Sequence, residues 1–346
     1  METLWFVLVA GMLAAYVVLD GFDLGAGALH LFVARSDDER RRVPRSIGPV
    51  WDGNEVWLVA AGGALFCAFP TLYATAFSGF YLPLMMVLWL LIGRACAIEF
   101  RHQIRGAPWQ PFWDAIFGVS SALLALVLGV ALGNVVRGVP LGPDGTFFAP
   151  LWTDFLPRGQ AGILDGYTLT VGLAALASLA MHGGLWIALK TDGLLQARAR
   201  RAAALAWAVA AFLVAAAGVL TALVQPHALH RFRAAPLGAL LPLAAALALG
   251  AVAWFLRRDR DRAAFLCSAA FLVSMFATAA FSVWPFVLPS TLDPARGLTL
   301  FRAAAGGKGL AVALAWWIPG MGLATAYFVF LYRKFAGKTT LEDEGY

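Results

Sequence analysis

The sequence predicts an all-α integral membrane protein with nine transmembrane helices, arranged as two four-helix bundles in a pseudo-repeat plus one peripheral helix. Of its 346 residues, 61% are hydrophobic and only 13% are charged, whereas a soluble domain carries about 25% charged residues. Apolar runs of about 20 residues, the length that crosses a bilayer, follow one another along the chain. Lysine and arginine gather in alternate loops between these runs, which is typical of polytopic membrane proteins.

Each expected span is an apolar run bounded by charged or glycine- and proline-rich segments. The first run does not resemble a cleavable signal peptide, because Glu2 replaces a basic leader and Asp20 and Asp23 interrupt the apolar stretch. The expected spans are about 4–33, 52–73, 78–98, 113–135, 162–189, 202–225, 236–256, 263–288 and 309–332. They divide the chain into a first bundle (1–135), an extracytoplasmic loop (136–161), a second bundle (162–290) and a ninth helix with a cytoplasmic tail (291–346).

The positions of the basic residues predict the orientation. Of the 26 lysines and arginines, 18 fall on one side of the expected spans, 7 fall on the other side, and Arg94 alone lies inside a span. The richer side comprises the loops 35–45, 101–105, 190–201, 257–262 and 333–338. This asymmetry places the C-terminus in the cytoplasm and the N-terminus outside. It also explains the net charge of +6 without a nucleic-acid partner.

An internal repeat accompanies this organisation. Residues 19–27 (LDGFDLGAG) match residues 164–172 (LDGYTLTVG) at five of nine positions. One copy opens each half of the chain, with four expected spans between them, as a parallel repeat requires. Chance similarity between apolar segments is the competing explanation. The second copy has Thr168 where the first has Asp23, so the chemistry is expected mainly in the first half.

Carboxylates within or beside the first three spans are the main functional candidates. Asp20 and Asp23 are three residues apart and share one helix face; Gly27 and His30 continue that face. Asp52 and Glu55 open the second span, and Arg94 and Glu99 close the third. An ionisable group at the centre of a span costs roughly 2.5–3.5 kcal/mol on insertion scales, so such groups are usually functional.

In the predicted topology all six of these charged residues fall in the cytoplasmic half of the membrane. Carboxylates graded from the surface to the mid-membrane suit proton uptake, and an arginine beside them can hold a neighbouring acid ionised. The structural alternative is that the acids cap helices and pair with loop arginines. It applies best to Asp52, which precedes a helix with Glu55 three residues on, as in a capping box.

Histidine and cysteine give weaker signals. His30 and His182 lie within spans, but two isolated histidines are more often hydrogen-bonded packing residues than paired haem ligands, so no haem held by this chain is expected. Cys67, Cys96 and Cys267 have no metal-binding or disulfide spacing. We expect them to be small packing residues.

Four segments carry a resemblance to a known family. They are VLDGFDLGAG at 18–27, SIGPVWDGNEVWLVAAGGALFCAFPTLYATAFSGFY at 46–81, IGRACAIEFR at 92–101 and FSVWPFVLPST at 281–291. In order and spacing they resemble subunit II of the cytochrome bd quinol oxidases, including the cyanide-insensitive branch. The motif WDGNEVW, followed by GGALF and SGFY, is highly specific, whereas the stretch 200–260 resembles the family only in hydropathy.

The resemblance implies a bacterial respiratory complex in the cytoplasmic membrane that oxidises quinol and reduces dioxygen to water. It implies that two b-type haems, one d-type haem and the quinol-oxidising loop belong to a partner, subunit I. This chain would stabilise that partner and contribute to a cytoplasmic proton path without binding a cofactor or metal itself. A small single-span subunit, quinone and lipids are further partners that fit the family.

The resemblance also implies roles for individual residues. Asp52 and Glu99 match positions of the proton path, and Asp23, Trp51 and Arg94 match other important positions, with Asn54 of the same WDGN motif in support. Some relatives have Asp in place of Glu99, which keeps a titratable group. Others have Gln in place of Glu55, so the resemblance does not imply that Glu55 carries protons. Proton transport by Glu55 and by Asp20 is our own inference.

Two other functions remain open from the sequence alone. A proton-coupled secondary transporter would also place acids in spans and contain a repeat, but it usually has broken helices and a substrate site shared by both halves. The second half here lacks matching acids. A self-sufficient haem anchor would require axial ligands that the histidines do not supply as a pair.

Overall fold

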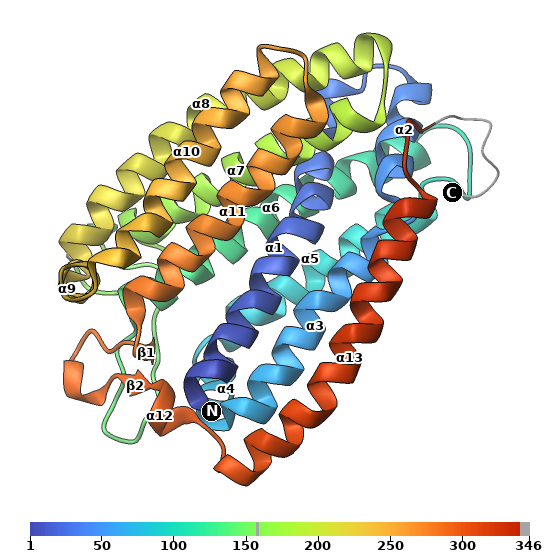
Figure 1. Cartoon of the computed structure of the whole chain (residues 1–346). Helices are drawn as coiled ribbons and strands as arrows, with labels where there is room; N and C mark the ends of the chain where they lie inside the picture. The colour runs from blue at the N-terminus through green and yellow to red at the C-terminus, as the bar shows by residue number, and fades with distance from the viewer. Residues whose placement is uncertain (157–158, 340–346) are drawn as a thin grey trace.

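The computed structural model describes residues 1–156 and 159–339, and within them the chain is almost entirely helical (Figure 1). The end of the expected cytoplasmic tail, residues 340–346, lies outside the described residues. The helices are α1 (Glu2–Val33), α2 (Asp37–Ile47), α3 (Trp51–Ala68), α4 (Pro70–Gly79), α5 (Tyr81–Phe100), α6 (Trp109–Arg137), α7 (Gly166–Lys190), α8 (Gly193–Val224), α9 (Pro226–Ala234), α10 (Leu240–Leu256), α11 (Asp261–Val283), α12 (Leu300–Ala303) and α13 (Gly307–Lys334). Two short strands, β1 (Phe286–Leu288) and β2 (Leu298–Thr299), pair antiparallel.

Eight helices among the described residues are long and apolar enough to cross a membrane, namely α1, α5, α6, α7, α8, α10 with its preceding turn, α11 and α13. The expected second span, 52–73, is instead broken into α3 and α4 at Phe69, because Pro70 lacks an amide hydrogen and starts a new helix. With 18 residues and a polar first turn, α3 does not meet the same criterion. The expected count of nine is therefore not confirmed.

Two other expected boundaries were wrong. The eighth span was expected to reach residue 288, but α11 ends at Val283 and the chain turns at Pro285 into β1. Proline and its restricting effect on the preceding residue account for this ending. The sixth span was expected from residue 202, but α8 begins at Gly193, so about nine residues rich in arginine extend the helix beyond its apolar part.

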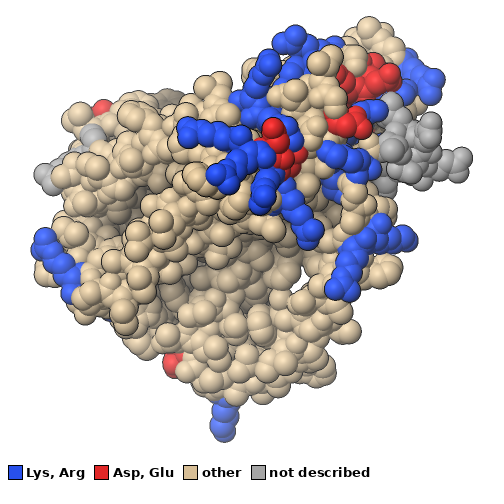
Figure 2. Space-filling model, turned by 45° about the horizontal axis from the view of Figure 1, so that its top comes forward, with Lys and Arg blue, Asp and Glu red and all other residues tan. Residues whose placement is uncertain are grey.

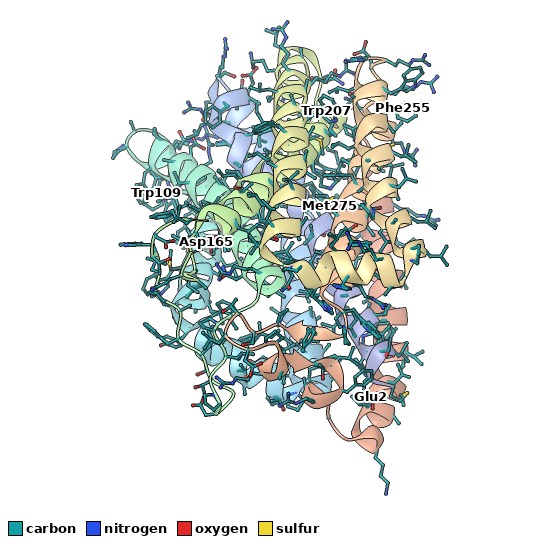
Figure 3. The ribbon with its side chains drawn as sticks, turned by 90° about the vertical axis from the view of Figure 1, so that its left-hand side faces the viewer. Glu2, Trp109, Asp165, Trp207, Phe255 and Met275 are labelled. Atoms are coloured by element: carbon teal, nitrogen blue, oxygen red, sulfur yellow. The ribbon has the colours of Figure 1, made fainter. Side chains whose placement is uncertain are left out.

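The long helices form two groups that meet where α1 and α6 pack against α7. Helices α1, α3, α5 and α6 pack together, as do α7, α8, α10 and α11, and α1 also packs against α7 and α11. Helix α13 lies at the edge of the molecule against α3 (Figure 1). In the second group, Trp207, Phe255 and Met275 come from three different helices and pack into one apolar cluster (Figure 3).

The contact between α1 and α7 depends on glycine. A Cβ atom added to Gly25 would lie 1.8 Å from the carbonyl oxygen of Leu179, and one added to Gly183 would lie 2.2 Å from the backbone nitrogen of Ala26. The two backbones therefore touch where they cross, which is how small residues bring membrane helices together. This crossing fixes the position of α1 between the two groups.

The nine-residue sequence match does not mark equivalent places in the two groups. Asp20 lies in the buried middle of α1. Asp165, its counterpart in the match, is the N-cap of α7, where its side chain accepts a hydrogen bond from the backbone of Thr168. The second copy thus caps a helix, while the first carries acids inside one.

One end of the molecule, which we call the basic end, carries α2 and the last turn of α13. Lysine and arginine gather there (Figure 2). Ion pairs join its loops, including Arg42 to Asp192 at 2.9 Å and Arg200 to Asp261 at 2.8 Å. The opposite end, the loop end, carries the long loop after α6 together with β1, β2 and α12 (Figure 1).

A pH-sensitive contact joins α2 to α8 at the basic end. Glu39 accepts hydrogen bonds from the backbone of Arg35 and Ser36 and forms an ion pair with Arg198. Burial alone would raise the pKa of Glu39, but these hydrogen bonds and the guanidinium outweigh it and lower that pKa. A carboxyl whose folded pKa is lowered contributes stability above its unfolded pKa, and this contribution is lost as the pH falls through the folded pKa.

We therefore expect α2 to loosen in acid. Amide hydrogen exchange in α2 of the detergent-solubilised protein should speed up as the pH falls below about 4.5, after correction for the intrinsic rate. In Glu39→Gln the same exchange should already be fast at neutral pH and should change little with acid. Equal protection of α2 in both proteins at neutral pH would contradict this account.

Candidate functional site

A fully buried arginine is the centre of the candidate site. Arg94 of α5 is 0% exposed, and its Nη2 donates to Asp20 Oδ1 of α1 at 2.7 Å and to Glu55 Oε2 of α3 at 3.0 Å. Asp20 is also 0% exposed, whereas the Glu55 side chain retains 20%. Three helices from distant parts of the chain thus bring one guanidinium and two carboxyls together.

Asp23 joins this group through Asn54. The Asn54 amide donates to Asp23 Oδ2 at 2.8 Å and to the carbonyl of Leu19 at 3.1 Å. The hydroxyl of Tyr332 on α13 in turn donates to Asn54 Oδ1 at 2.9 Å. Asn54 therefore ties α1, α3 and α13 together and orients the second buried carboxyl. We call Asp20, Asp23, Glu55, Arg94 and Asn54 the acid cluster.

Charge is not balanced within the acid cluster. Asp20 and Glu55 share one guanidinium, and Asp23 has a hydrogen bond from Asn54 but no ion pair, in a region where unpaired charge is costly. Several of its buried polar atoms also lack a hydrogen-bond partner among the described residues: Asp20 Oδ2, Asp23 Oδ1, Arg94 Nε and Arg94 Nη1. Carboxyls in excess over cations, with lone pairs left open, can take up and release protons.

The structure leaves Asp52 and Glu99 outside the acid cluster. Asp52 is exposed in the first turn of α3, and Glu99 is half-buried near the end of α5; neither makes an ion pair with another described residue. The capping role considered for Asp52 is wrong, because α3 begins one residue earlier with Val50 as its N-cap and no side-chain cap. Trp51 is buried and packs into the apolar core at the basic end.

A second polar group at the basic end was not predicted. Asp114 of α6 accepts a hydrogen bond at 2.5 Å from Arg101 and lies 2.8 Å from Nε2 of His30, while Arg101 also binds Asp37. The His30 and Asp114 side chains are 0% and 2% exposed. His30 had been treated as an isolated packing histidine, and its partner Asp114 lies 84 residues away in sequence. The one available signal was an acid at the start of the expected fourth span.

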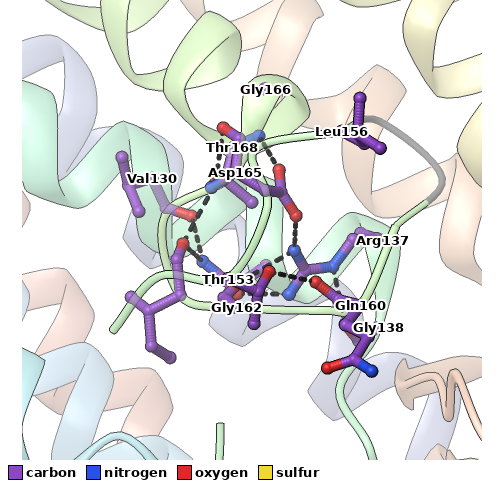
Figure 4. A network of polar contacts seen from close by, with 12 residues as sticks. Val130, Arg137, Gly138, Thr153, Leu156, Gln160, Gly162, Asp165, Gly166 and Thr168 are labelled. Atoms are coloured by element: carbon purple, nitrogen blue, oxygen red, sulfur yellow. Dashed lines mark hydrogen bonds and ion pairs between the residues drawn. The ribbon is translucent and has the colours of Figure 1, made fainter. Parts of the chain in front are cut away.

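A third polar network closes the loop end. Arg137, at the end of α6, forms a buried ion pair with Asp165 and donates to Asn134 Oδ1 at 2.7 Å and to the carbonyl of Gly162 at 2.9 Å (Figure 4). Asp165 also caps α7. This network fastens the loop between α6 and α7, which gives the acid of the second sequence copy a structural role.

The described residues contain no group of three or more His, Cys, Asp or Glu side chains placed to hold a metal ion. His182 lies 2.6 Å from Ser268 Oγ through Nδ1 and 3.1 Å from the carbonyl of Val18 through Nε2. Its ring stacks on Phe265. His182 is therefore held by protein groups on both nitrogens.

The chain matches one known protein family over nearly its whole length. The family model described as cytochrome bd terminal oxidase subunit II matches residues 1–335. The chain belongs to this family. Subunit II chains with curated names are similar over nearly their whole length: the ubiquinol oxidase subunit 2 of Escherichia coli K12 is 33% identical, covering 98% of this chain and 95% of its own. The corresponding protein of Bacillus subtilis is 35% identical, covering 90% and 89%.

The fold of subunit II also agrees with a solved structure. The bd oxidase of Geobacillus thermodenitrificans contains a chain that superposes with a TM-score of 0.78 at 18% sequence identity, covering 96% of this chain and 98% of that one. A likeness at this identity speaks for the fold alone. The family match and the curated relatives confirm the resemblance seen in the sequence, and this subunit II is part of an oxidoreductase complex of the respiratory chain.

Proposed function

We propose that this subunit II is the haem-free partner of a haem-bearing subunit I, in a complex of the bacterial cytoplasmic membrane that oxidises quinol and reduces dioxygen to water. Its own task is to stabilise subunit I and to conduct protons from the cytoplasm towards the oxygen chemistry. Family membership supports the complex, and the acid cluster supports the second task. The second sequence copy does not favour transporter chemistry, since its acid, Asp165, caps a helix.

The two histidines within the spans, His30 and His182, do not form a pair of haem ligands. A haem held by two axial ligands needs two facing nitrogens, whereas His182 is occupied on both nitrogens and His30 faces Asp114. We therefore assign the two b-type haems, the d-type haem and the quinol to subunit I. No step of the proposed path passes through a cofactor in this chain.

The unbalanced acid cluster is the observation on which the proton path rests. Glu55 lies between the buried Asp20 and the surface of the chain, since its side chain is 20% exposed and shares Arg94 with Asp20. Asp52 lies three residues before Glu55, at the start of the same helix. We propose that protons enter at Asp52 and Glu99 and move through Glu55 to Asp20 and Asp23.

The acids on α3 and α5 also favour a protein partner at this face. Large apolar side chains of the same helices are exposed, including Val59 (73%) and Trp89 (66%). Contact with lipid would suit them but not a partly exposed Glu55, because a charge against lipid costs roughly 2.5–3.5 kcal/mol at mid-membrane. We propose that subunit I covers this face, with the basic end in the cytoplasm and the N-terminus outside. A small single-span subunit, quinone and lipids would then bind elsewhere.

The test replaces each acid with the amide of the same shape, so that only the titratable group is lost. In the purified complex, Asp52→Asn and Glu99→Gln should each lower quinol oxidase turnover at least about tenfold with haem content unchanged, because a positioned proton-transfer group contributes about 10²–10⁴-fold. Asp38→Asn is the matched control, because Asp38 is an exposed acid at the same end, on α2, and its turnover should not change.

Two outcomes would count against the proposal in different ways. Loss of haem in proportion to activity would show that Asp52 and Glu99 act in assembly. Full turnover at full haem content in both variants would remove the proton path from this chain.

A further inference from the structure

A polar stripe runs along one face of α1 and extends beyond the acid cluster. Its members are Tyr16, Asp20, Asp23, Gly27 and His30, spaced alternately four and three residues apart. This spacing keeps them on one face of a helix. At 1.5 Å per residue the stripe is roughly 21 Å long. It connects the middle of the molecule with the basic end.

Three members of the stripe have a buried atom without a hydrogen-bond partner among the described residues, namely Asp20 Oδ2, Asp23 Oδ1 and His30 Nδ1. The Tyr16 hydroxyl, which has no partner of normal geometry, interacts with the Asp20 carboxyl. Tyr16 is 3% exposed and the other three are 0% exposed. Buried polar groups are almost always hydrogen-bonded, to protein or to ordered water. Beyond the Tyr16–Asp20 contact, the open atoms of Asp23 and His30 lie in one row along this helix face, where buried water molecules can satisfy them.

The gap in the stripe at Gly27 is filled by a hydroxyl from α6. A Cβ atom on Gly27 would lie 2.1 Å from Ser121 Oγ, so the hydroxyl occupies the space that a side chain would take. Ser121 is 0% exposed, and its Oγ has no partner among the described residues. The adjacent Ser120 differs, because its hydroxyl donates to the carbonyl of Ile116 at 2.6 Å. Ser121 thus adds an open polar atom between Asp23 and His30.

At the basic end the stripe stops at the His30–Asp114 pair. Arg101 binds Asp114 on both oxygens, and Arg40 lies 3.7 Å from it. Two guanidiniums hold Asp114 as a carboxylate, so Nε2 of His30 carries the hydrogen between them. In the neutral ring, Nδ1 is then an acceptor for water. Asp114 also lines a pocket of about 260 Å³, together with Arg35, Asp37, Arg40, Gly106, Ala107, Gln110 and Pro111.

We propose that this stripe is a hydrated second branch of the proton path, which joins the basic end at the His30–Asp114 pair to Asp23 and Asp20 independently of Asp52 and Glu99. The inference rests on the proposed proton-conducting function and adds a route to it. Protons hop between waters and the Ser121 hydroxyl, each of which accepts one proton from its outer neighbour and releases another inward. His30 is a positioning residue, because Nδ1 orients the outermost water.

The test uses the two neighbouring serines as a matched pair. Ser121→Ala and Ser120→Ala remove the same hydroxyl from adjacent positions of α6, and each is made in the wild-type complex and together with Asp52→Asn. Parallel routes add their fluxes. Ser121→Ala alone should therefore lower turnover about twofold or less. In the Asp52→Asn complex it should lower turnover at least about tenfold further, because a proton-transfer group contributes about 10²–10⁴-fold. Ser120→Ala should have no effect in either.

Proton-specific readouts separate this branch from a packing effect. The solvent deuterium isotope effect on turnover should increase in the Ser121→Ala, Asp52→Asn double variant, and Ser121→Thr, which keeps a hydroxyl, should restore the Asp52→Asn rate. If Asp52→Asn lowers turnover but Ser121→Ala has no further effect, the second branch is wrong while the proposed function stands. If the double variant turns over at the wild-type rate with full haem, the proposed function itself fails.

Discussion

Arg94→Met should prevent assembly of the oxidase. The side chain of Arg94 is fully buried and is the only cation that the described structure places on Asp20 and Glu55. Its removal leaves two carboxyls unpaired inside α1 and α3, and breaking a buried pair in this way costs about 3–5 kcal/mol. We expect haem-containing complex in the membrane to fall to a small fraction of the wild-type amount.

The control for Arg94 is Arg105→Met, which removes an exposed cation at the basic end and should leave the amount of complex unchanged. Absorption spectra of membranes give the haem content, and native electrophoresis gives the amount of intact complex. Adding Asp20→Asn to Arg94→Met should restore part of the complex, since one unpaired carboxyl is removed. Wild-type amounts of complex in Arg94→Met alone would contradict the assigned role.

Gly25→Val should have an effect of similar size for a different reason. Already the first side-chain carbon would lie 1.8 Å from the carbonyl oxygen of Leu179, in the backbone of α7. The backbone cannot move aside as a flexible side chain would, so α1 and α7 must separate along their crossing. Because α1 also carries Asp20 and Asp23, the acid cluster should lose its alignment together with the packing.

Gly11→Val is the matched control on the same helix, because a Cβ atom at Gly11 meets nothing within 4 Å. The yield of purified complex and its half-life at a fixed elevated temperature should both drop sharply in Gly25→Val and stay near wild type in Gly11→Val. Similar losses in the two variants would show that the crossing of α1 and α7 is not specially sensitive to glycine.

The sequence predicted most of the acid cluster because local spacing determines it. Asp20 and Asp23 share a face of α1 whatever the rest of the fold does, and charged residues within spans are rare enough to stand out. The expected order of the spans then placed Glu55 and Arg94 at the same depth. The expected gradation from surface to interior also agrees with the structure, where Asp52 and Glu99 lie nearer the surface than Asp20.

The features that sequence reasoning missed depend on distant contacts or on single residues. The His30–Asp114 pair and the hydrogen bond from Tyr332 to Asn54 join residues 84 and 278 positions apart, and spacing carries no information about such pairs. Pro70 was a local sign of the break between α3 and α4, but the hydrophobic residues around it suggested one continuous span. The repeat motif was misleading because it aligns Asp165 with Asp20. The two residues are of the same type, but Asp165 caps the start of a helix whereas Asp20 lies inside one.

The central claim is that carboxyls of this chain deliver the protons consumed when the partner subunit reduces dioxygen. Proton uptake from the medium during a single turnover, followed with a pH-indicator dye after oxygen is mixed with the fully reduced complex, tests it most directly. In Asp52→Asn with full haem content, uptake should be slower than in the Asp38→Asn control by the same factor as steady-state turnover. Uptake at the same rate in both complexes would contradict the claim.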